Sequence, residues 1–168
     1  MVIIGLGTNL GDRTAQLQRA VRELAAILSP IECSAVYEGK ALLPAGAPAH
    51  WDMPFLNMAL KGETSLTPRA LLMEVKAIER RLGRTPQGHW GPREIDIDIL
   101  AYGDLVLEED DLIIPHAGLL SRDFALVPLA DVAPQWRYPK AGALRGKTAR
   151  VLADAITQTL TKTEWVVL

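Results

Sequence analysis

Hydrophobic and polar positions along the chain follow two periods, one typical of strands and one typical of helices. Continuous apolar runs or strict alternation predict strands over residues 1–7, 31–37, 55–60 and 95–102. Apolar residues repeat every three to four positions over residues 13–28 and 67–82, as they do on one face of a helix. The resulting order is β-α-β-β-α-β, followed by further short elements. This order favours the α+β class, with a mainly antiparallel sheet and helices on one of its faces.

Local signals mark where several of these elements begin and end. Asp12 and Thr67 are expected to cap the first turns of the two helices, and Gly83 takes the position of a glycine that ends a helix. Residues 105–114 are expected to pair beside the strand at 95–102. The long stretch between the second and third strands, residues 38–54, shows little periodicity and is expected to be a functional loop.

Composition narrows the class of protein. A chain of 168 residues that is 49% hydrophobic can bury a full core, so we expect a single domain over residues 1–168. The 18 Lys and Arg residues are outnumbered by 20 Asp and Glu, which disfavours electrostatic binding of nucleic acid. Cys33 is the only cysteine, which excludes an internal disulfide and a Cys-rich zinc site and suits a reducing compartment. No apolar run reaches the roughly 18 residues of a membrane span. We therefore expect a cytoplasmic protein that binds neither nucleic acid nor membrane.

A pair of aspartates in the fourth predicted strand is the strongest chemical signal. Side chains alternate along a strand, so Asp96 and Asp98 share one face while Ile95, Ile97 and Ile99 share the other. The two Cα atoms lie about 6.6 Å apart, a span over which two carboxylates can bind hard cations such as Mg²⁺. Aspartate is depleted in strands, and like charges on one face repel unless a cation or an arginine compensates them. The alternative is a half-exposed strand whose polar face carries two aspartates by chance.

Basic residues gather near this pair in the sequence. Arg93 precedes it, and the end of the preceding helix carries Lys76, Arg80, Arg81 and Arg84. Part of this cluster is explained by the favourable interaction of cations with the carboxyl end of a helix. Guanidinium groups also bind phosphate through two donors, and arginines together with Mg²⁺ commonly stabilise phosphoryl transfer.

Other candidate residues stay ambiguous when each is taken alone. His116 can be a capping or core residue, and Arg122 can be a surface charge. Phe55 and Phe124 are the only phenylalanines, and both can belong to the core. Asn57 is the most unusual of the set, because a half-buried amide within a strand needs hydrogen-bond partners.

Taken together, these residues resemble the 6-hydroxymethyl-7,8-dihydropterin pyrophosphokinase family of the folate pathway. The central motif is similar to Trp-Gly-Pro-Arg-x-x-Asp-x-Asp, which begins here at Trp90. The stretches that match the family in order and approximate spacing are residues 5–12, 55–57, 79–84, 90–98 and 115–124. The similarity runs to about Pro139 and continues weakly through the last helix.

The resemblance implies a ferredoxin-like fold and a specific reaction. A pyrophosphoryl group passes from ATP to the hydroxymethyl oxygen of the pterin, and AMP is released. Two Mg²⁺ ions held by Asp96 and Asp98 bridge the ATP phosphates, while Arg84 and Arg93 steady the transferring group. No conventional general base is evident, and either Asp98 or a metal-bound environment is a candidate for taking the proton of the hydroxyl group.

The same resemblance assigns the remaining site residues to the two small-molecule substrates. Those implied to bind ATP are Lys76, Glu79, Arg84, Arg93, His116 and Arg122. Those implied to bind the pterin are Phe55, Asn57, Trp90, Asp96 and Phe124, with the two phenylalanines on either side of the ring and Trp90 on a closing loop. We expect the protein to act as a monomer.

Two other classes of function share some of these features, one a different enzyme and the other a non-enzymatic binding module. A metal-dependent nucleotidyl- or glycosyltransferase can use the same aspartates with a different acceptor. An RNA-binding module of the same fold is disfavoured by 5% aromatic residues and a net charge of -2. A small-molecule sensor stays open, because fold alone does not determine function. Formation of AMP only when the hydroxymethyl pterin is present separates these hypotheses.

Overall fold

The computed structural model describes residues 1–85, 91–165 and 167. The strands of its main sheet are β1 (Val2–Thr8), β2 (Glu32–Cys33), β3 (Tyr37–Gly39), β4 (Phe55–Gly62), β5 (Asp96–Tyr102) and β8 (Thr161–Lys162). Their order is β5-β1-β4-β3-β8, with β2 also paired to β4, and each pairing is antiparallel. The expected antiparallel sheet is confirmed.

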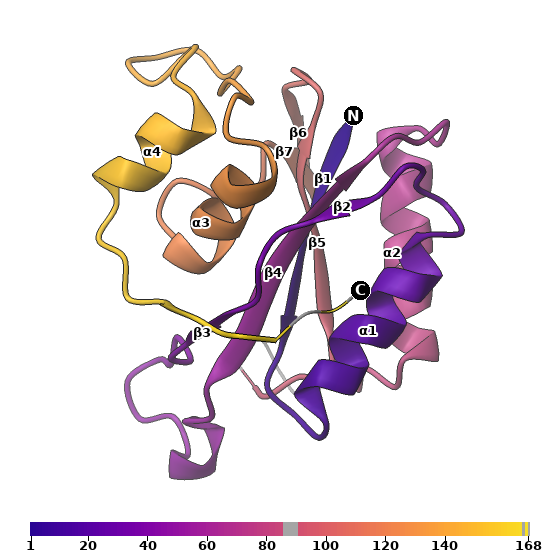
Figure 1. Ribbon diagram of the computed structural model, residues 1–168, viewed down its shortest axis with the longest axis vertical. Coiled ribbons are helices and arrows are strands. Elements are labelled where there is room, and N and C mark those ends of the chain that lie inside the picture. The colour runs from indigo at the N-terminus through magenta and orange to yellow at the C-terminus, as the bar shows by residue number, and fades with distance from the viewer. Residues whose placement is uncertain (86–90, 166, 168) are drawn as a thin grey trace.

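The helices are α1 (Arg13–Leu24), α2 (Pro68–Arg81), α3 (Asp123–Val132) and α4 (Ala149–Ala155), with a 3₁₀ helix, η1, at Ala49–Trp51. None of the helices within the described ranges is long and apolar enough to cross a membrane. Figure 1 shows α1 and α2 on one side of the sheet and α3 and α4 on the other. The expectation that helices cover one face is therefore wrong.

Two apolar faces of the sheet explain this arrangement. Val2 and Ile4 of β1 belong to the core that α1 and α2 cover, whereas Ile3 between them belongs to the core that α3 and α4 cover. Ala59 of β4 and Leu100 of β5 are buried in that second core. Because successive strand residues point to opposite faces, a strand that is apolar at every position needs cover on both sides.

The signals at the helix ends act as predicted. The Asp12 side chain accepts a hydrogen bond from the Ala15 N–H at 3.0 Å, and the Thr67 side chain accepts one from the Ala70 N–H at 3.3 Å. Each bond satisfies an N–H group that the first turn of a helix leaves without a partner. Gly83 follows α2 with a φ of +90°, a left-handed conformation that glycine adopts without a steric penalty.

Two of the predicted elements have different bounds. The helix expected over 13–28 ends at Leu24. The strand expected over 31–37 is split into β2 and β3, because the Ser34 hydroxyl accepts the Ala59 N–H at 2.9 Å in place of a backbone carbonyl. A side chain thus interrupts the backbone ladder at this point.

The expected pairing of residues 105–114 beside the strand at 95–102 is also wrong. These residues form β6 (Leu107–Glu109) and β7 (Leu112–Ile114), which pair with each other in a separate two-stranded sheet. The tight connection between them makes the hairpin a more local solution than pairing with β5.

The register of the central strand brings distant parts of the sequence together. β1 runs antiparallel to both β4 and β5, and Gly7 lies opposite Asn57 on one side and Asp96 on the other. Because β1 ends where both neighbours begin, the first residues of β4 and β5 lie beside the same strand end. Two of the stretches predicted to carry the site, one with Asn57 and one with Asp96, therefore lie on either side of β1.

Candidate active site

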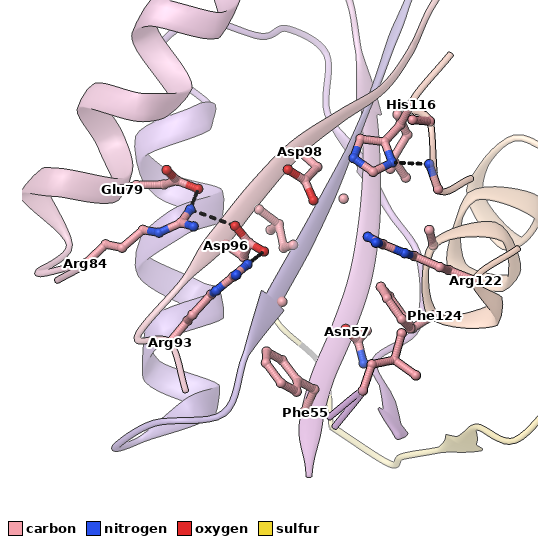
Figure 2. Close-up of a pocket in the computed structure, with 18 of the residues that line it drawn as sticks. Phe55, Asn57, Glu79, Arg84, Arg93, Asp96, Asp98, His116, Arg122 and Phe124 are labelled. Atoms are coloured by element: carbon pink, nitrogen blue, oxygen red, sulfur yellow. Dashed lines mark hydrogen bonds and ion pairs between the residues drawn. The ribbon is translucent and has the colours of Figure 1, made fainter. Parts of the chain in front are cut away.

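A cavity of about 880 Å³ lies against the end of β1. Every predicted site residue that the structure describes lines it, and these are Phe55, Asn57, Lys76, Glu79, Arg84, Arg93, Asp96, Asp98, His116, Arg122 and Phe124. Figure 2 shows side chains from β4, α2, β5 and the start of α3 converging on this space. Trp90, the remaining predicted residue, lies outside the described ranges.

Asp96, the first residue of β5, is held between two arginines. Arg84 Nη1 lies 2.6 Å from one carboxylate oxygen of Asp96, and Arg93 forms an ion pair with the other. Burial acts to raise the pKa of Asp96, but the charges of Arg93 and Arg84 outweigh it and hold that pKa below its usual value. Asp96 is therefore an ionised and oriented carboxylate.

Glu79 on α2 belongs to the same network of ion pairs and links it to the backbone of β5. Only 3% of this residue is exposed. Its carboxylate accepts a hydrogen bond from the Ile97 N–H at 2.7 Å and forms ion pairs with Arg84 and with Lys76, whose Nζ lies at 3.1 Å. Burial raises the pKa of Glu79, while Lys76, the Ile97 N–H and Arg84 act against that rise. Because Ile97 separates the two aspartates, Glu79 fixes the part of β5 that carries both.

Asp98 is not compensated in this way. Within the described ranges, its carboxylate receives neither a hydrogen bond nor an ion pair, and it points into the cavity (Figure 2). Burial and the negative charge of Asp96 raise the pKa of Asp98, and the more distant His116 and Lys76 offset only part of that rise. The two aspartates share one face, as predicted, but within the described part of the chain cations contact Asp96 and not Asp98.

The opposite wall of the cavity carries nitrogen donors on His116 and Arg122. The Gly118 N–H donates to His116 Nδ1 at 3.1 Å, so the proton of the neutral ring lies on Nε2. The Arg122 guanidinium lies over the backbone of Gly118, where an added Cβ would come within 2.7 Å of Arg122 Nε. Arg122 Cζ also lies 5.8 Å from the centre of the Phe124 ring, within the range of a cation–π contact. Figure 2 shows His116 and Arg122 facing the aspartates across the cavity.

The remaining end of the cavity is aromatic with one buried amide. Asn57 is 6% exposed and lies between Phe55 and Phe124 in the view of Figure 2. A Cβ at Gly7 would come within 3.3 Å of Asn57 Oδ1 and 3.6 Å of the Phe55 ring, so the glycine leaves room beside both. Two aromatic faces and an amide can hold a flat ring with a polar edge.

Comparison with known sequences decides the family. Residues 3–134 match the family model described as 7,8-dihydro-6-hydroxymethylpterin-pyrophosphokinase (HPPK). The chain belongs to the HPPK family. The resemblance based on the motif around Asp96 and Asp98 is confirmed.

Named HPPK relatives cover most of this chain. The 2-amino-4-hydroxy-6-hydroxymethyldihydropteridine pyrophosphokinase of Aquifex aeolicus is 41% identical over 142 residues, which are 82% of this chain and 83% of that protein. The folate synthesis bifunctional protein of Chlamydia trachomatis is 42% identical over 156 residues, which are 90% of this chain. The chain spans about a third of the length of the chlamydial bifunctional relatives it matches, 35% in this case.

Solved structures of HPPK-DHPS proteins share the fold. The wild-type HPPK-DHPS of Plasmodium falciparum superposes with a TM-score of 0.62 at 16% identity, covering 91% of this chain and 44% of that one. An HPPK-DHPS in complex with substrates superposes with a TM-score of 0.67 at 14% identity, covering 92% of this chain and 44% of that one. The mixed arrangement of an antiparallel sheet with helices is therefore typical of HPPK domains.

The cavity also involves residues that the sequence pattern does not single out. Lys40 and Leu42 line it, and both come from the loop at 38–54, where length is the only functional signal. Beside the cavity, Asn9 resembles an ordinary turn residue in the sequence, yet only 4% of it is exposed in the fold. A buried amide directly after a strand is the signal that distinguishes it.

Proposed function

We propose that this chain transfers a pyrophosphoryl group from ATP to 6-hydroxymethyl-7,8-dihydropterin, giving the pterin diphosphate and AMP in folate biosynthesis. HPPK membership supports the reaction. One observation carries the assignment to this chain's own residues: paired aspartates, several basic side chains and an aromatic pair with a buried amide all line one cavity. Each group matches one part of the reaction, namely metal-bound polyphosphate, phosphate charge and a flat heterocycle.

Mg²⁺ suits the donor set of the two aspartates. Carboxylate oxygens are ligands that Mg²⁺ prefers, and the half-buried carboxylate of Asp98 has no cation in contact among the described residues. No group of three or more His, Cys, Asp or Glu side chains within the described ranges can hold a metal unaided. Asp96 and Asp98 would therefore hold two Mg²⁺ ions jointly with the phosphates of ATP. When bound, the ions supply charge neutralisation at the polyphosphate.

The basic side chains divide between the transferring group and the rest of the nucleotide. Arg84 and Arg93 already meet at Asp96, and from there their guanidinium groups face the space that the transferring phosphates would occupy. His116 Nε2 and Arg122 donate to nucleotide phosphates from the opposite wall. Lys76, with Glu79 beside it, binds the nucleotide at the α2 side of the cavity.

The aromatic end takes the pterin. Phe55 and Phe124 stack on the two faces of the ring, and Asn57 pairs with its polar edge. Asp96 lies one strand away from Asn57, across Gly7, so a ring held here places its hydroxymethyl group toward the aspartates. Trp90 is assigned to the pterin by its position in the family motif.

The chemistry requires alignment and charge neutralisation more than a strong base. The hydroxymethyl oxygen attacks the β-phosphorus of ATP, the bond from that phosphorus to the oxygen shared with the α-phosphate breaks, and AMP leaves with that oxygen. Arg84 and Arg93 stabilise the charge that moves onto the phosphate oxygens. Asp98 takes the proton of the hydroxyl group, a role supported by its position in the cavity, where no described residue forms a hydrogen bond or ion pair with its carboxylate.

We also propose the finer features of the fold and the state of the protein. A ferredoxin-like topology for the core is supported by the strand order β5-β1-β4-β3, and a single domain is supported by two cores that share one sheet. For a cytoplasmic monomer, the single cysteine supports the location, because it suits a reducing compartment.

Formation of AMP from ATP and Mg²⁺, with and without the hydroxymethyl pterin, tests the proposed function. AMP should appear in equal amount with the pterin diphosphate, and only when the pterin is present. A pterin that carries a methyl group in place of the hydroxymethyl group is the matched control, since it can stack but cannot attack. AMP formed without the acceptor, or none with it, would contradict the proposal.

A further inference from the structure

Asn9 lies directly after β1, between the two strands that carry most of the site. Gly7 pairs with Asn57 on β4 and with Asp96 on β5, so the chain beyond Thr8 reaches the level at which both strands begin. The segments that enter these strands include Phe55 on one side and Arg93 on the other. A residue at position 9 can therefore reach both segments.

Asn9 bonds to both of these segments at once. Its side-chain Oδ1 accepts a hydrogen bond from the Arg93 N–H at 2.7 Å, and its backbone N–H donates to the Arg93 carbonyl at 3.1 Å. Its Nδ2 donates to the Met53 carbonyl at 3.3 Å, just before Pro54 and Phe55. With 4% of the residue exposed, water has little access to replace these bonds.

The amide group is the chemistry that this position needs. Asparagine carries an acceptor and a donor at the end of one short side chain, so it can join two backbone segments of opposite polarity. Aspartate keeps the acceptor for the Arg93 N–H and loses the donor for the Met53 carbonyl. Alanine loses both. The neighbouring Thr8 makes a simpler contact, because its hydroxyl donates to the Glu94 carbonyl at 2.7 Å on one side.

We propose that Asn9 is a positioning residue that sets the spacing between the pterin-stacking Phe55 and the phosphate-neutralising Arg93. This inference rests on the proposed function. Asn9 itself is not among the residues that line the cavity, so it acts through the backbone at Met53 and Arg93. Transfer requires the hydroxymethyl oxygen and the polyphosphate to be aligned closely, and a misplacement of about 1 Å can slow such a reaction about 100-fold. Loss of the amide should slow the transfer step more than it weakens binding of either substrate.

The variants Asn9→Ala and Asn9→Asp test this role, with Ser34→Ala as the matched control. Ser34 also bonds to backbone through its side chain, accepting the Ala59 N–H at 2.9 Å and donating to the Ala35 carbonyl at 2.7 Å, but it lies at the break between β2 and β3. The measurements are the single-turnover rate, the Kd of each substrate, the Tm and hydrogen exchange at the Arg93 amide.

We expect the single-turnover rate of Asn9→Ala to fall about 30- to 100-fold, with each Kd changed less than about 5-fold. The single-turnover rate of Asn9→Asp should lie between those of Asn9→Ala and the wild type, and the Arg93 amide should stay protected from exchange. Ser34→Ala should have a lower Tm and an unchanged single-turnover rate. Exchange at Arg93 should accelerate only in Asn9→Ala. If Asn9→Ala does not fold, the rate of Asn9→Asp decides.

Two outcomes would overturn the inference. One is that the Asn9 variants have the same single-turnover rate as Ser34→Ala when their Tm values are lowered by the same amount. The other is weaker substrate binding with an unchanged rate. If the wild-type chain forms no AMP, the proposed function fails, and the coupling of the two segments through Asn9 is then decided by hydrogen exchange at Arg93.

Discussion

Ion pairs join α2 to β5 along one wall of the cavity, whereas within the described ranges no ion pair involves residues 116–124, which form the facing wall. On the first wall, Glu79 and Asp96 both pair with Arg84. On the second wall, His116 is held by one backbone N–H, and Arg122 rests on an aromatic ring. The α2–β5 wall therefore has its charges in place before a substrate arrives. Within the described ranges, His116 Nε2 and the Arg122 guanidinium on the second wall make no hydrogen bond or ion pair.

The contrast matches the work each wall would do. Groups that stabilise charge in a transition state are most effective when they need no rearrangement during the reaction. Groups that bind and release a nucleotide gain from donors whose partners are supplied by the ligand. Asp98 belongs to the first wall by position, yet among the residues that the structure describes no cation contacts it. Likewise, no described anion forms an ion pair with His116 or Arg122. Substitutions that exchange or remove these features test the contrast.

The largest effect is expected at Asp98. Asp98→Asn should reduce pterin-dependent AMP formation about 1000-fold or more, equivalent to about 4 kcal/mol, because it removes a proposed ligand for Mg²⁺. Its Tm without Mg²⁺ should stay equal or rise, since the substitution removes a half-buried charge that has no ion pair among the described residues. An AMP assay and a thermal melt check both results.

Asp104→Asn is the control for that substitution, because Asp104 is an exposed aspartate in the turn after β5. It should change neither activity nor Tm. Activity of Asp98→Asn within about tenfold of the wild type would remove Asp98 from the metal site.

A smaller effect is expected at Arg93. Arg93→Ala should lower the single-turnover rate about 100-fold and weaken substrate binding less than about 5-fold, because its charge is needed most as the phosphate charge redistributes. Rapid-quench measurement of AMP gives the rate, and Arg22→Ala on the exposed side of α1 is the control. Loss of affinity with an unchanged rate would place Arg93 among the binding groups of the other wall instead.

The opposite pattern is expected at His116. His116→Ala should raise the KM for ATP about tenfold and leave the affinity for the pterin unchanged, since we propose that the ring donates to a nucleotide phosphate. Steady-state kinetics with each substrate varied in turn provide the measurement. His50→Ala, at an exposed position of η1, should match the wild type. A fall in single-turnover rate with an unchanged KM would contradict the division of work between the two walls.

The smallest effect concerns stability as a function of pH. The pKa of Asp96 is lowered in the folded protein, so its contribution is present above about pH 4 and is lost as the pH falls through that lowered pKa. The pKa of Asp98 is raised, so its ionisation costs stability as the pH rises from about 4 through that raised pKa. The two aspartates should therefore act with opposite signs.

Urea unfolding from pH 3 to pH 7 measures both contributions. At pH 7, Asp96→Asn should be less stable than the wild type by about 1 kcal/mol, and the difference should shrink toward pH 3. Asp98→Asn should be as stable as the wild type or more so at pH 7. Losses of equal size in both variants would mean that the two aspartates are compensated alike.

The charged strand could be predicted from sequence because its signal is local. Alternation alone placed Asp96 and Asp98 on one face, and the caps at Asp12 and Thr67 are set by neighbouring residues. The bond from Glu79 to the Ile97 N–H joins α2 to β5, and no local pattern reveals it. Family resemblance brought Glu79 into the candidate site, but the partners of its carboxylate came from the fold.

The remaining misses also come from contacts between distant segments. Ile3 shows that β1 is apolar at successive positions, which calls for cover on both faces, but the covering helices lie more than 100 residues later in the chain. The bond between Ser34 and Ala59 depends on the register of two strands. The predicted site residues that the structure describes line one cavity, while the role of each residue stays a prediction that the variants above address.

Gly118 lies beneath Arg122, so a substitution there can alter the wall proposed to bind the nucleotide without replacing a charged residue. At Gly118, an added methyl group would meet the guanidinium at 2.7 Å and act as a wedge that tilts it toward or away from the phosphates. The proposed affinity for the nucleotide can thus be changed through side-chain volume alone at position 118, while the ionic groups of the α2–β5 wall stay unchanged.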